Sequence, residues 1–347
     1  MKEKRIQTAA IVFCILCAAV CGFFFGLYLN NPVTANETET DGNLSIVQIA
    51  QNSADTVVEI ATETTVHDSR MRQYVSEGAG SGVIISADGV IVTNNHVIDG
   101  ASKITVRLRS GKEYEAKLLG ADNATDLAVV KIDANNLKYA VFGDSDALLV
   151  GETAVAIGNP LGELGGTVTE GIISAKDRTI VIDNQEMTLL QTSAAINPGN
   201  SGGGLFNDQG ALIGIVNAKF ADTGIEGLGF AIPINVAKPI ISQLKDHGYV
   251  TGRPALGIEV ALGESSYLSY YFHVNRTGLF VMRTADETHP LKPWDRIVSI
   301  DNQVINTYED LTALLKTHKI GDKVSIKIIR NYEEMTVTAI VIEQKPF

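Results

Sequence analysis

Hydrophobic residues are distributed along this chain in three different ways. Residues 6–29 form one long apolar run without a charged side chain. Between residues 44 and 235, the apolar residues come in short runs separated by glycine and polar residues. After residue 254 the short runs continue, and residues 308–319 have a helix-like pattern. These patterns predict a membrane helix, a mainly β region and a smaller α+β module.

The long apolar run is sufficient to cross a bilayer at about 1.5 Å per residue. Lys2, Lys4 and Arg5 precede it, and the next Lys or Arg is Arg70. The positive-inside rule therefore predicts a cytoplasmic N-terminus and an exported body. A cleaved signal peptide, with a processing site at residues 33–35, is the alternative. The run is longer than the apolar part of an ordinary signal peptide, which favours an uncleaved anchor.

The central region is expected to be a β-barrel or a β-sandwich, because its short apolar runs are bounded by turn residues. Two helices are expected beside the strands, at residues Ser45–Ser53 and Asn235–His247, with Gly248 ending the second. A domain boundary follows near Gly248–Pro254. We therefore expect a cytoplasmic tip and anchor (1–29), a polar linker (30–43), a β domain (44–250) and an α+β module (251–347).

Composition narrows the possible functions. The chain has 347 residues, with 28 Lys and Arg against 40 Asp and Glu, and its net charge is −12. Such an acidic chain is a poor candidate for nucleic-acid binding, which relies on clustered positive charge. Its three cysteines, Cys14, Cys17 and Cys21, all lie in the apolar run. This excludes a disulfide scaffold, a Cys-ligated zinc site and a thiol nucleophile from the rest of the chain.

Three polar motifs interrupt the apolar runs of the central region. His96 follows one run, Asp126 precedes another, and Ser201 lies in the glycine-rich turn GNSGG. A serine hydroxyl attacks at neutral pH when an imidazole accepts its proton, and a carboxylate orients that imidazole. Glycines around the serine allow backbone N–H groups to converge on a developing oxyanion. Together the motifs indicate nucleophilic serine catalysis.

Two alternatives to this interpretation remain open. Asp122 is close enough to Asp126 to take the role of the carboxylate. The turn GNSGG also fits the G-x-S-x-G elbow of the α/β-hydrolases. However, an elbow requires a helix after the serine, whereas the residues after Ser201 are turn-like. An elbow also requires the order Ser, acid, His, which is not the order found here.

The segments TNNHVI, DLAVVKI, IGNPLG, GIISA and INPGNSGG, in this order, resemble the HtrA/Deg family of trypsin-like serine proteases. The resemblance covers residues 44–347, and the C-terminal module resembles a PDZ domain. With the anchor, the layout is similar to that of the membrane-tethered, DegS-type members. The resemblance implies a mainly β fold, in which a trypsin-like pair of six-stranded antiparallel β-barrels is followed by a PDZ-like α+β domain. It also implies a homotrimer.

The resemblance implies roles for individual residues. His96 would be the general base, Asp126 the carboxylate that orients it, and Ser201 the nucleophile. The backbone N–H groups of Gly199 and Ser201, with Asn200 between them, would form the oxyanion hole. No cofactor or metal is implied, and the histidines show no metal-ligand spacing.

Substrate binding is expected at an apolar S1 pocket. The residues that would line it are Ile196, Ile215, Val216 and Asn217. Because these segments contain no acidic residue, we expect cleavage after small aliphatic residues rather than after Arg or Lys. Ser193 and Gly204 depart from the family pattern near this pocket, although neither touches the triad.

Regulation is expected at two places. Arg178 occupies the position of a family arginine that supports the active oxyanion geometry. The PDZ-like module would bind peptide C-termini by strand addition through the loop formed by Ala255, Leu256, Gly257 and Ile258. Residues 288–295 are shorter than the family segment, so the peptide groove is expected to be altered.

The resulting hypothesis is an ATP-independent, membrane-anchored serine endopeptidase. It would act outside the cytoplasm in protein quality control or stress signalling, on unfolded or regulatory proteins. The alternative is a non-catalytic chaperone or PDZ adaptor built on a protease fold.

Overall fold

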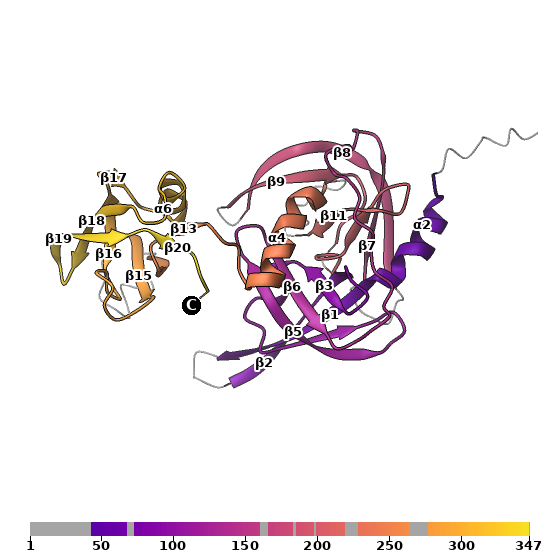
Figure 1. The fold of residues 1–347 in the computed structure, drawn as a ribbon, viewed down its shortest axis with the longest axis horizontal. Helices are drawn as coiled ribbons and strands as arrows, with labels where there is room; N and C mark the ends of the chain where they lie inside the picture. Colours follow the sequence, from indigo (N-terminus) through magenta and orange to yellow (C-terminus); the bar gives the residue numbers. More distant parts are fainter. Residues whose placement is uncertain are drawn as a thin grey trace, which may run out of the picture. The chain divides into compact units, whose positions relative to one another are not determined.

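The computed structural model describes residues 43–67, 73–159, 166–182, 185–197, 199–218, 228–263 and 277–346. These parts of the chain are mainly β, as the pattern of short apolar runs predicts (Figure 1). In the described ranges, no helix combines the length and the apolar character that a membrane span requires. The predicted anchor, residues 6–29, lies outside the described residues.

The first six strands close into an antiparallel barrel in the order β1-β2-β3-β6-β5-β4. The strands are β1 (Val57–His67), β2 (Gln73–Ile84), β3 (Val90–Thr93), β4 (Lys103–Arg107), β5 (Glu113–Asp122) and β6 (Leu127–Ile132). β-Branched residues such as Val58, Ile60 and Ile91 fill the interior and are fully buried. Such residues fit the pleated surface of a strand well, which explains why these segments form a sheet.

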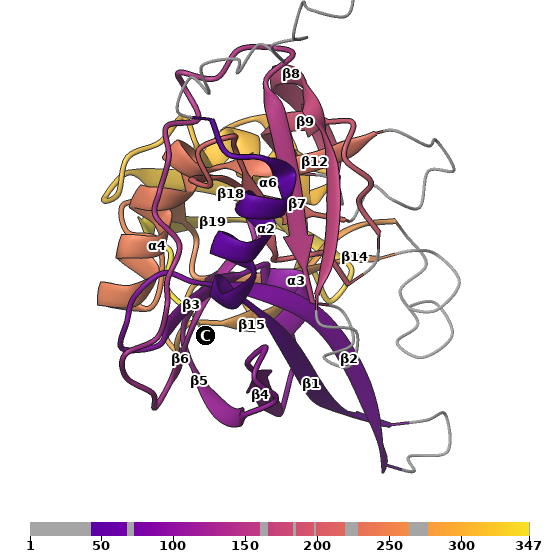
Figure 2. The same ribbon diagram turned by 90° about the vertical axis from the view of Figure 1, so that its right-hand side faces the viewer.

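A second closed barrel follows, in the order β10-β11-β12-β9-β8-β7. Its strands are β7 (Thr153–Gly158), β8 (Thr167–Ile182), β9 (Gln185–Thr192), β10 (Gly204–Phe206), β11 (Leu212–Asn217) and β12 (Gly229–Pro233). β8 and β9 form the long hairpin that Figure 2 shows. The prediction of two six-stranded antiparallel barrels is confirmed.

Helix α4 (Ile234–His247) packs against both barrels, because it contacts β5 and β6 of the first and β11 and β12 of the second. One apolar core includes Val129, Ile215 and Leu244, and so joins the two barrels and this helix. The helix ends as predicted at Gly248, which has a φ of 85°.

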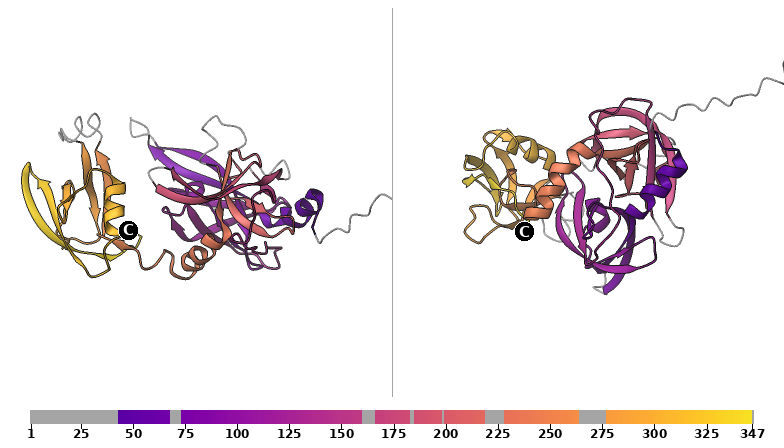
Figure 3. Two further views of the ribbon diagram at one scale, coloured as in Figure 1. Left: turned by 90° about the horizontal axis from the view of Figure 1, so that it is seen from above. Right: turned by 45° about the vertical axis from the view of Figure 1, so that its right-hand side comes forward.

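Helix α2 (Ile46–Ser53) precedes the first barrel and contacts β7 of the second (Figure 3). Ser45 caps it, since its side chain accepts a hydrogen bond from the Gln48 N–H while the Gln48 side chain bonds back to the Ser45 N–H. The helix predicted at Ser45–Ser53 is therefore present. A single turn, η1 (Ala54–Thr56), leads from it into β1.

The C-terminal region forms a sheet in the order β14-β15-β16-β18-β19, in which β17 also pairs with β16. The elements of this region are β13 (Pro254–Ala255), β14 (Ile258–Gly263), β15 (Gly278–Thr284), β16 (Arg296–Ile300), β17 (Gln303–Val304), α6 (Tyr308–Leu315), β18 (Lys323–Arg330), β19 (Glu333–Ile340) and β20 (Ile342–Glu343). β13 and β20 pair with each other as a separate two-stranded sheet. Buried and exposed residues alternate along β18, with Val324, Ile326 and Ile328 fully buried. This is the α+β module that the sequence predicts.

The helix of this module is shorter than predicted. The sequence pattern predicts a helix over residues 308–319, but α6 ends at Leu315. Beyond it, the Thr317 hydroxyl donates to the Leu314 carbonyl (2.7 Å), and the His318 Nδ1 lies 3.0 Å from the same oxygen. Side chains thus satisfy a carbonyl that a further helical turn would have used.

Arg330 is expected to be essential for the stability of the C-terminal region. Its guanidinium donates two 2.7 Å hydrogen bonds to the carboxylate of Asp295, which is fully buried. An Arg330→Ala substitution leaves this buried charge without its cationic partner, at a cost of about 3–5 kcal/mol in the free energy of unfolding. Urea unfolding, followed through the fluorescence of the only tryptophan, Trp294, measures the loss.

Lys327→Ala is the matched control for this prediction. Lys327 lies on the same strand but forms an exposed, 3.9 Å pair with Glu334. Its removal is expected to change the stability by less than about 1 kcal/mol. Equal losses for the two variants would contradict the importance assigned to the buried pair.

Candidate active site

His96 is held at the end of β3 by a short helix, α3 (Asn95–Ile98). The Asp126 carbonyl accepts a hydrogen bond from the Asn95 N–H (3.1 Å) and another from the Asn94 side chain (3.0 Å). The His96 N–H donates to Asp126 Oδ1 (3.0 Å). The backbone of the histidine is therefore bound to the aspartate before the imidazole itself is considered.

Asp126 lies in the turn between β5 and β6 and is 2% exposed. Its backbone φ is 53°, in the left-handed region that few residues other than glycine and asparagine adopt. Its Oδ2 lies 2.7 Å from His96 Nδ1 and accepts a 2.9 Å hydrogen bond from the side-chain amide of Asn217. Three donors thus converge on one buried carboxylate and fix its orientation.

Ser201 lies in the turn before β10 and is 6% exposed. Its Oγ is 3.0 Å from His96 Nε2 and accepts a 3.2 Å hydrogen bond from the Ala218 N–H. Gly202, the next residue, has a φ of 81°, and a Cβ there would lie 2.2 Å from the Ser81 carbonyl oxygen. Only glycine fits this position, which explains part of the glycine-rich sequence around the serine.

The three side chains form a continuous hydrogen-bonded series from carboxylate to hydroxyl. If Nδ1 carries the proton and donates to Asp126, Nε2 is left as an acceptor facing the Ser201 hydroxyl. This arrangement can remove the hydroxyl proton as the oxygen attacks an electrophile, while the carboxylate stabilises the imidazolium that forms. Within the described part of the chain, no group of three or more His, Cys, Asp or Glu residues could hold a metal ion.

The turn that precedes Ser201 is held by its own backbone. The Asn200 N–H donates to the Asn197 carbonyl (3.0 Å), and the Asn200 carbonyl accepts from the Gly203 N–H (2.9 Å). Gly199 has a φ of 100°. Because a trans peptide points its C=O and N–H in opposite directions, the bond to Gly203 directs the Ser201 N–H to the other side of the turn.

The geometry distinguishes between the two candidate aspartates. Asp122 does not contact His96. Its carboxylate accepts hydrogen bonds from Thr125 and forms an ion pair with Arg253. The α/β-hydrolase alternative is wrong, because Ser201 is followed by a barrel strand, β10, instead of a helix.

The residues predicted to line S1 lie in different environments. Ile215 and Val216 are fully buried in apolar cores, and Ile196 is partly buried against the core that contains Val216. The Asn217 side-chain amide donates to Asp126 and so lies beside the carboxylate of the candidate site. Sequence reasoning missed this contact, although a lone asparagine at the end of a buried apolar strand was a signal for it.

The two predicted regulatory regions lie apart in the chain and differ in burial. Arg178 is exposed, at an irregularity in the pairing of β8 with β9. In the PDZ-like region, Ala255 pairs with Ile342, and the carbonyl of the buried Leu256 lies 2.8 Å from His289 Nε2. Gly257, with a φ of 67°, leads from this loop to Ile258 at the start of β14.

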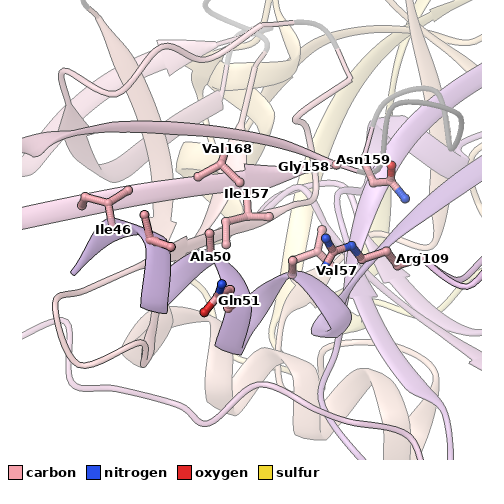
Figure 4. Close-up of a pocket in the computed structure, with 12 residues that line it drawn as sticks. Ile46, Ala50, Gln51, Val57, Arg109, Ile157, Gly158, Asn159 and Val168 are labelled. Carbon is pink, nitrogen blue, oxygen red and sulfur yellow. The ribbon is translucent and has the colours of Figure 1, made fainter. Parts of the chain in front are cut away.

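A pocket of about 470 Å³ lies between α2 and the second barrel. In Figure 4, Ile46 and Ala50 of α2 lie on one side of it, near Ile157 and Val168 of the barrel. None of the three residues of the His96 series lines it. The pocket therefore does not contain the His96 series, although Gly158 and Asn159 at the end of β7 are among the residues that line it.

Comparison with protein-family models matches both regions of the chain. Residues 80–215 match the trypsin-like peptidase domain, and residues 254–341 match the PDZ domain. These ranges contain His96, Asp126 and Ser201 in the first case and the predicted peptide-binding loop in the second.

Curated relatives are proteases of one family. The serine protease Do-like HtrB of Bacillus subtilis (strain 168) is 42% identical over 287 residues, which cover 76% of this chain and 62% of that protein. A probable periplasmic serine endoprotease, DegP-like, of Rickettsia prowazekii (strain Madrid E) is 41% identical over 266 residues, covering 74% and 51%. The chain thus spans between half and two thirds of the length of these two relatives.

Solved structures agree with this assignment. The HtrA-type protease AlgW with a decapeptide has a TM-score of 0.58 and is 37% identical, covering 87% of this chain and 100% of the AlgW chain. The serine endoprotease from Yersinia pestis has a TM-score of 0.54 and is 32% identical. The double barrel, the PDZ match and this identity along a whole solved chain show that the protein belongs to the HtrA/DegP family of serine proteases.

Proposed function

We propose that this chain is a serine endopeptidase in which Ser201 is the nucleophile, His96 the general base and Asp126 the carboxylate that orients it. One observation carries the proposal: His96 lies within hydrogen-bonding distance of both partners, at 2.7 Å from Asp126 and 3.0 Å from Ser201. The buried aspartate and the Asn217 amide hold the imidazole in the tautomer that the reaction needs.

The proposed reaction proceeds in two stages. Ser201 Oγ attacks the scissile carbonyl carbon while its proton moves to His96 Nε2, and the N–H groups of Gly199 and Ser201, with Asn200 between them, stabilise the tetrahedral oxyanion. The C–N bond then breaks, and His96 gives its proton to the leaving amine. Water, deprotonated by the same imidazole, hydrolyses the acyl-enzyme and restores the Ser201 hydroxyl.

The substrates proposed are unfolded or regulatory proteins, cleaved after small aliphatic residues without ATP. The apolar side chain of Ile196, partly exposed beside the turn, supports this specificity. We place the S1 pocket near Ile196 and β11, and assign Arg178 to the control of the oxyanion turn. The division into residues 1–29, 30–43, 44–250 and 251–347 remains part of the proposal.

A membrane-anchored enzyme with its catalytic domain outside the cytoplasm fits the relatives and the sequence. Several relatives are named as periplasmic endoproteases, and residues 6–29 have the length and composition of an anchor. The PDZ match and the peptide-bound AlgW structures support C-terminal peptide binding at residues 255–258. A homotrimer and a role in quality control or stress signalling complete the proposal.

Casein degradation tests the proposed activity. The purified chain is expected to cut unfolded casein into peptides and to be labelled at Ser201 by a fluorophosphonate probe, since such probes react with activated serines. Gel electrophoresis and mass spectrometry measure the two results. A chain that suppresses casein aggregation but neither cleaves casein nor reacts with the probe would support the chaperone or adaptor alternative.

A further inference from the structure

Ser81 lies in β2 of the first barrel, opposite the turn of the second barrel that carries Ser201, and is fully buried. Its hydroxyl donates to the Gly199 carbonyl (2.6 Å) and accepts from the Asn159 N–H (2.8 Å). Its N–H donates to the Ser201 carbonyl (2.8 Å), and its own carbonyl accepts from the Thr93 hydroxyl (2.7 Å). All of the hydrogen-bonding groups of this residue are therefore engaged at the contact between the barrels.

Two of these bonds lie on either side of the nucleophile. Ser81 binds the carbonyl of Gly199 with its side chain and the carbonyl of Ser201 with its backbone. The peptide between them, from Asn200 to Ser201, is fixed by the bond from Gly203. Every carbonyl from Gly199 to Ser201 is consequently bound, and the Ser201 N–H is left directed away from the Gly203 bond.

We propose that Ser81 is a positioning residue for the oxyanion hole, acting through the Gly199 carbonyl. This inference rests on the proposed function of the same site. Gly199 has a φ of 100°, and a glycine rotates between backbone conformations with little steric resistance. By binding the Gly199 carbonyl, the Ser81 hydroxyl fixes the peptide between Gly199 and Asn200. This restrains the peptides on either side of it, which carry the N–H groups of Gly199 and Ser201 that face the developing oxyanion.

The Ser81 hydroxyl is both a hydrogen-bond donor and an acceptor, which an apolar side chain cannot be. It accepts from Asn159 and donates to Gly199 at the same time, so it joins the end of β7 to the oxyanion turn. Gly158, at the end of β7, also lies against Asn200: a Cβ there would be 2.4 Å from the Asn200 Oδ1. Removing the hydroxyl leaves the Gly199 carbonyl and the buried Asn159 N–H unpaired, and rotation of the Gly199 peptide is the direct way to relieve this.

Steady-state kinetics of a Ser81→Ala variant tests the inference. With a fluorogenic peptide that has valine before the scissile bond, kcat is expected to fall about tenfold or more while KM stays within about twofold, because loss of an oxyanion donor acts on the transition state. The inhibition constant of the corresponding peptide boronic acid, which forms a tetrahedral adduct, should weaken by a similar factor. A loss of folded protein would lower the apparent kcat but would leave the inhibition constant unchanged, so the boronic acid separates a positioning role from a structural one.

Ser145→Ala is the matched control. Ser145 is 1% exposed, and its hydroxyl accepts from the Asn235 N–H (3.1 Å), far along the chain from the turn. This variant should keep kcat within about twofold of the wild type. A Ser81→Cys variant, in which a slightly larger thiol forms only weak hydrogen bonds, should have a kcat between those of Ser81→Ala and the wild type, and it replaces the alanine variant if that variant is unfolded by circular dichroism.

The outcomes separate this inference from the proposed function. A folded Ser81→Ala or Ser81→Cys variant with the wild-type kcat would overturn the role of Ser81, as would an equal loss of kcat in Ser145→Ala. A wild type that neither cleaves the peptide nor binds the boronic acid would instead overturn the proposed function itself.

Discussion

Replacing Ser201 by alanine is expected to lower kcat for casein and for peptide substrates by about 10⁴- to 10⁶-fold, because the substitution removes the nucleophile and leaves only binding and the oxyanion hole. The protein should remain folded, since one oxygen is lost and, among the described residues, the hydrogen bond donated to that oxygen comes from the Ala218 N–H. Initial rates at saturating substrate measure the effect. Circular dichroism and the thermal unfolding midpoint verify that the variant is folded.

The control for this variant is Ser242→Ala. Ser242 lies on α4 with its hydroxyl 3.2 Å from the exposed Asp246 carboxylate, and its removal should leave the rate unchanged. Retention of more than about one tenth of the wild-type rate in Ser201→Ala would contradict the assignment of the nucleophile. Loss of casein cleavage with retention of peptide binding by the PDZ-like region would agree with it.

An Asp126→Asn variant is expected to lower kcat by about 10⁴-fold with little change in structure. Asp126 Oδ2 accepts from both His96 Nδ1 and Asn217 Nδ2, and Oδ1 accepts from the His96 N–H. An amide NH₂ placed at either oxygen meets a donor. The imidazole can relieve the clash between donors by adopting the other tautomer, with its proton on Nε2. In that tautomer Nε2 faces Ser201 as a donor and can no longer accept the hydroxyl proton.

Asp122→Asn provides the comparison for that variant. The Asp122 carboxylate stabilises the turn by accepting hydrogen bonds from the N–H and the hydroxyl of Thr125. The side-chain oxygen of an asparagine could accept the same bonds. We expect kcat to change by less than about tenfold, because no donor of the catalytic series is involved. A larger loss in Asp122→Asn than in Asp126→Asn would reverse the assignment of the carboxylate. The pH dependence of kcat, measured on both variants, reports whether the imidazole still titrates in the reaction.

The architecture was largely predictable because it depends on local patterns. Short β-branched runs separated by glycine predict strands, and the capping residues Ser45 and Gly248 mark helix ends within a residue or two. The closure of the barrels was predicted only through the family resemblance, since it depends on pairings such as β1 with β4 and β7 with β10 that join distant segments. The end of α6 was missed, because the side chains of Thr317 and His318 bond to the Leu314 carbonyl nearby in the chain, and the apolar pattern does not show this local competition with the helix.

The candidate site divides in the same way. Residue types and their order pointed to His96 and Ser201, but spacing could not distinguish Asp122 from Asp126, because four residues in a turn can place either carboxylate toward the imidazole. The contact of the Asn217 amide with Asp126 could not be predicted, because the direction of a strand side chain depends on register, which the sequence does not show. The sequence does not distinguish Ser81 from other small residues of its glycine-rich strand, because the contact that makes it important is with Gly199 of the opposite barrel.

The division of the site between two barrels has a consequence for the order in which the chain is made. The general base and the nucleophile are 105 residues apart, and the second barrel closes only when β12 pairs with β9. A chain that has emerged only as far as β6 therefore carries an imidazole and a carboxylate but no nucleophile beside them. The three side chains of the candidate site are therefore expected to come together only after synthesis has passed Pro233, so that a truncated product ending before that residue lacks a complete site.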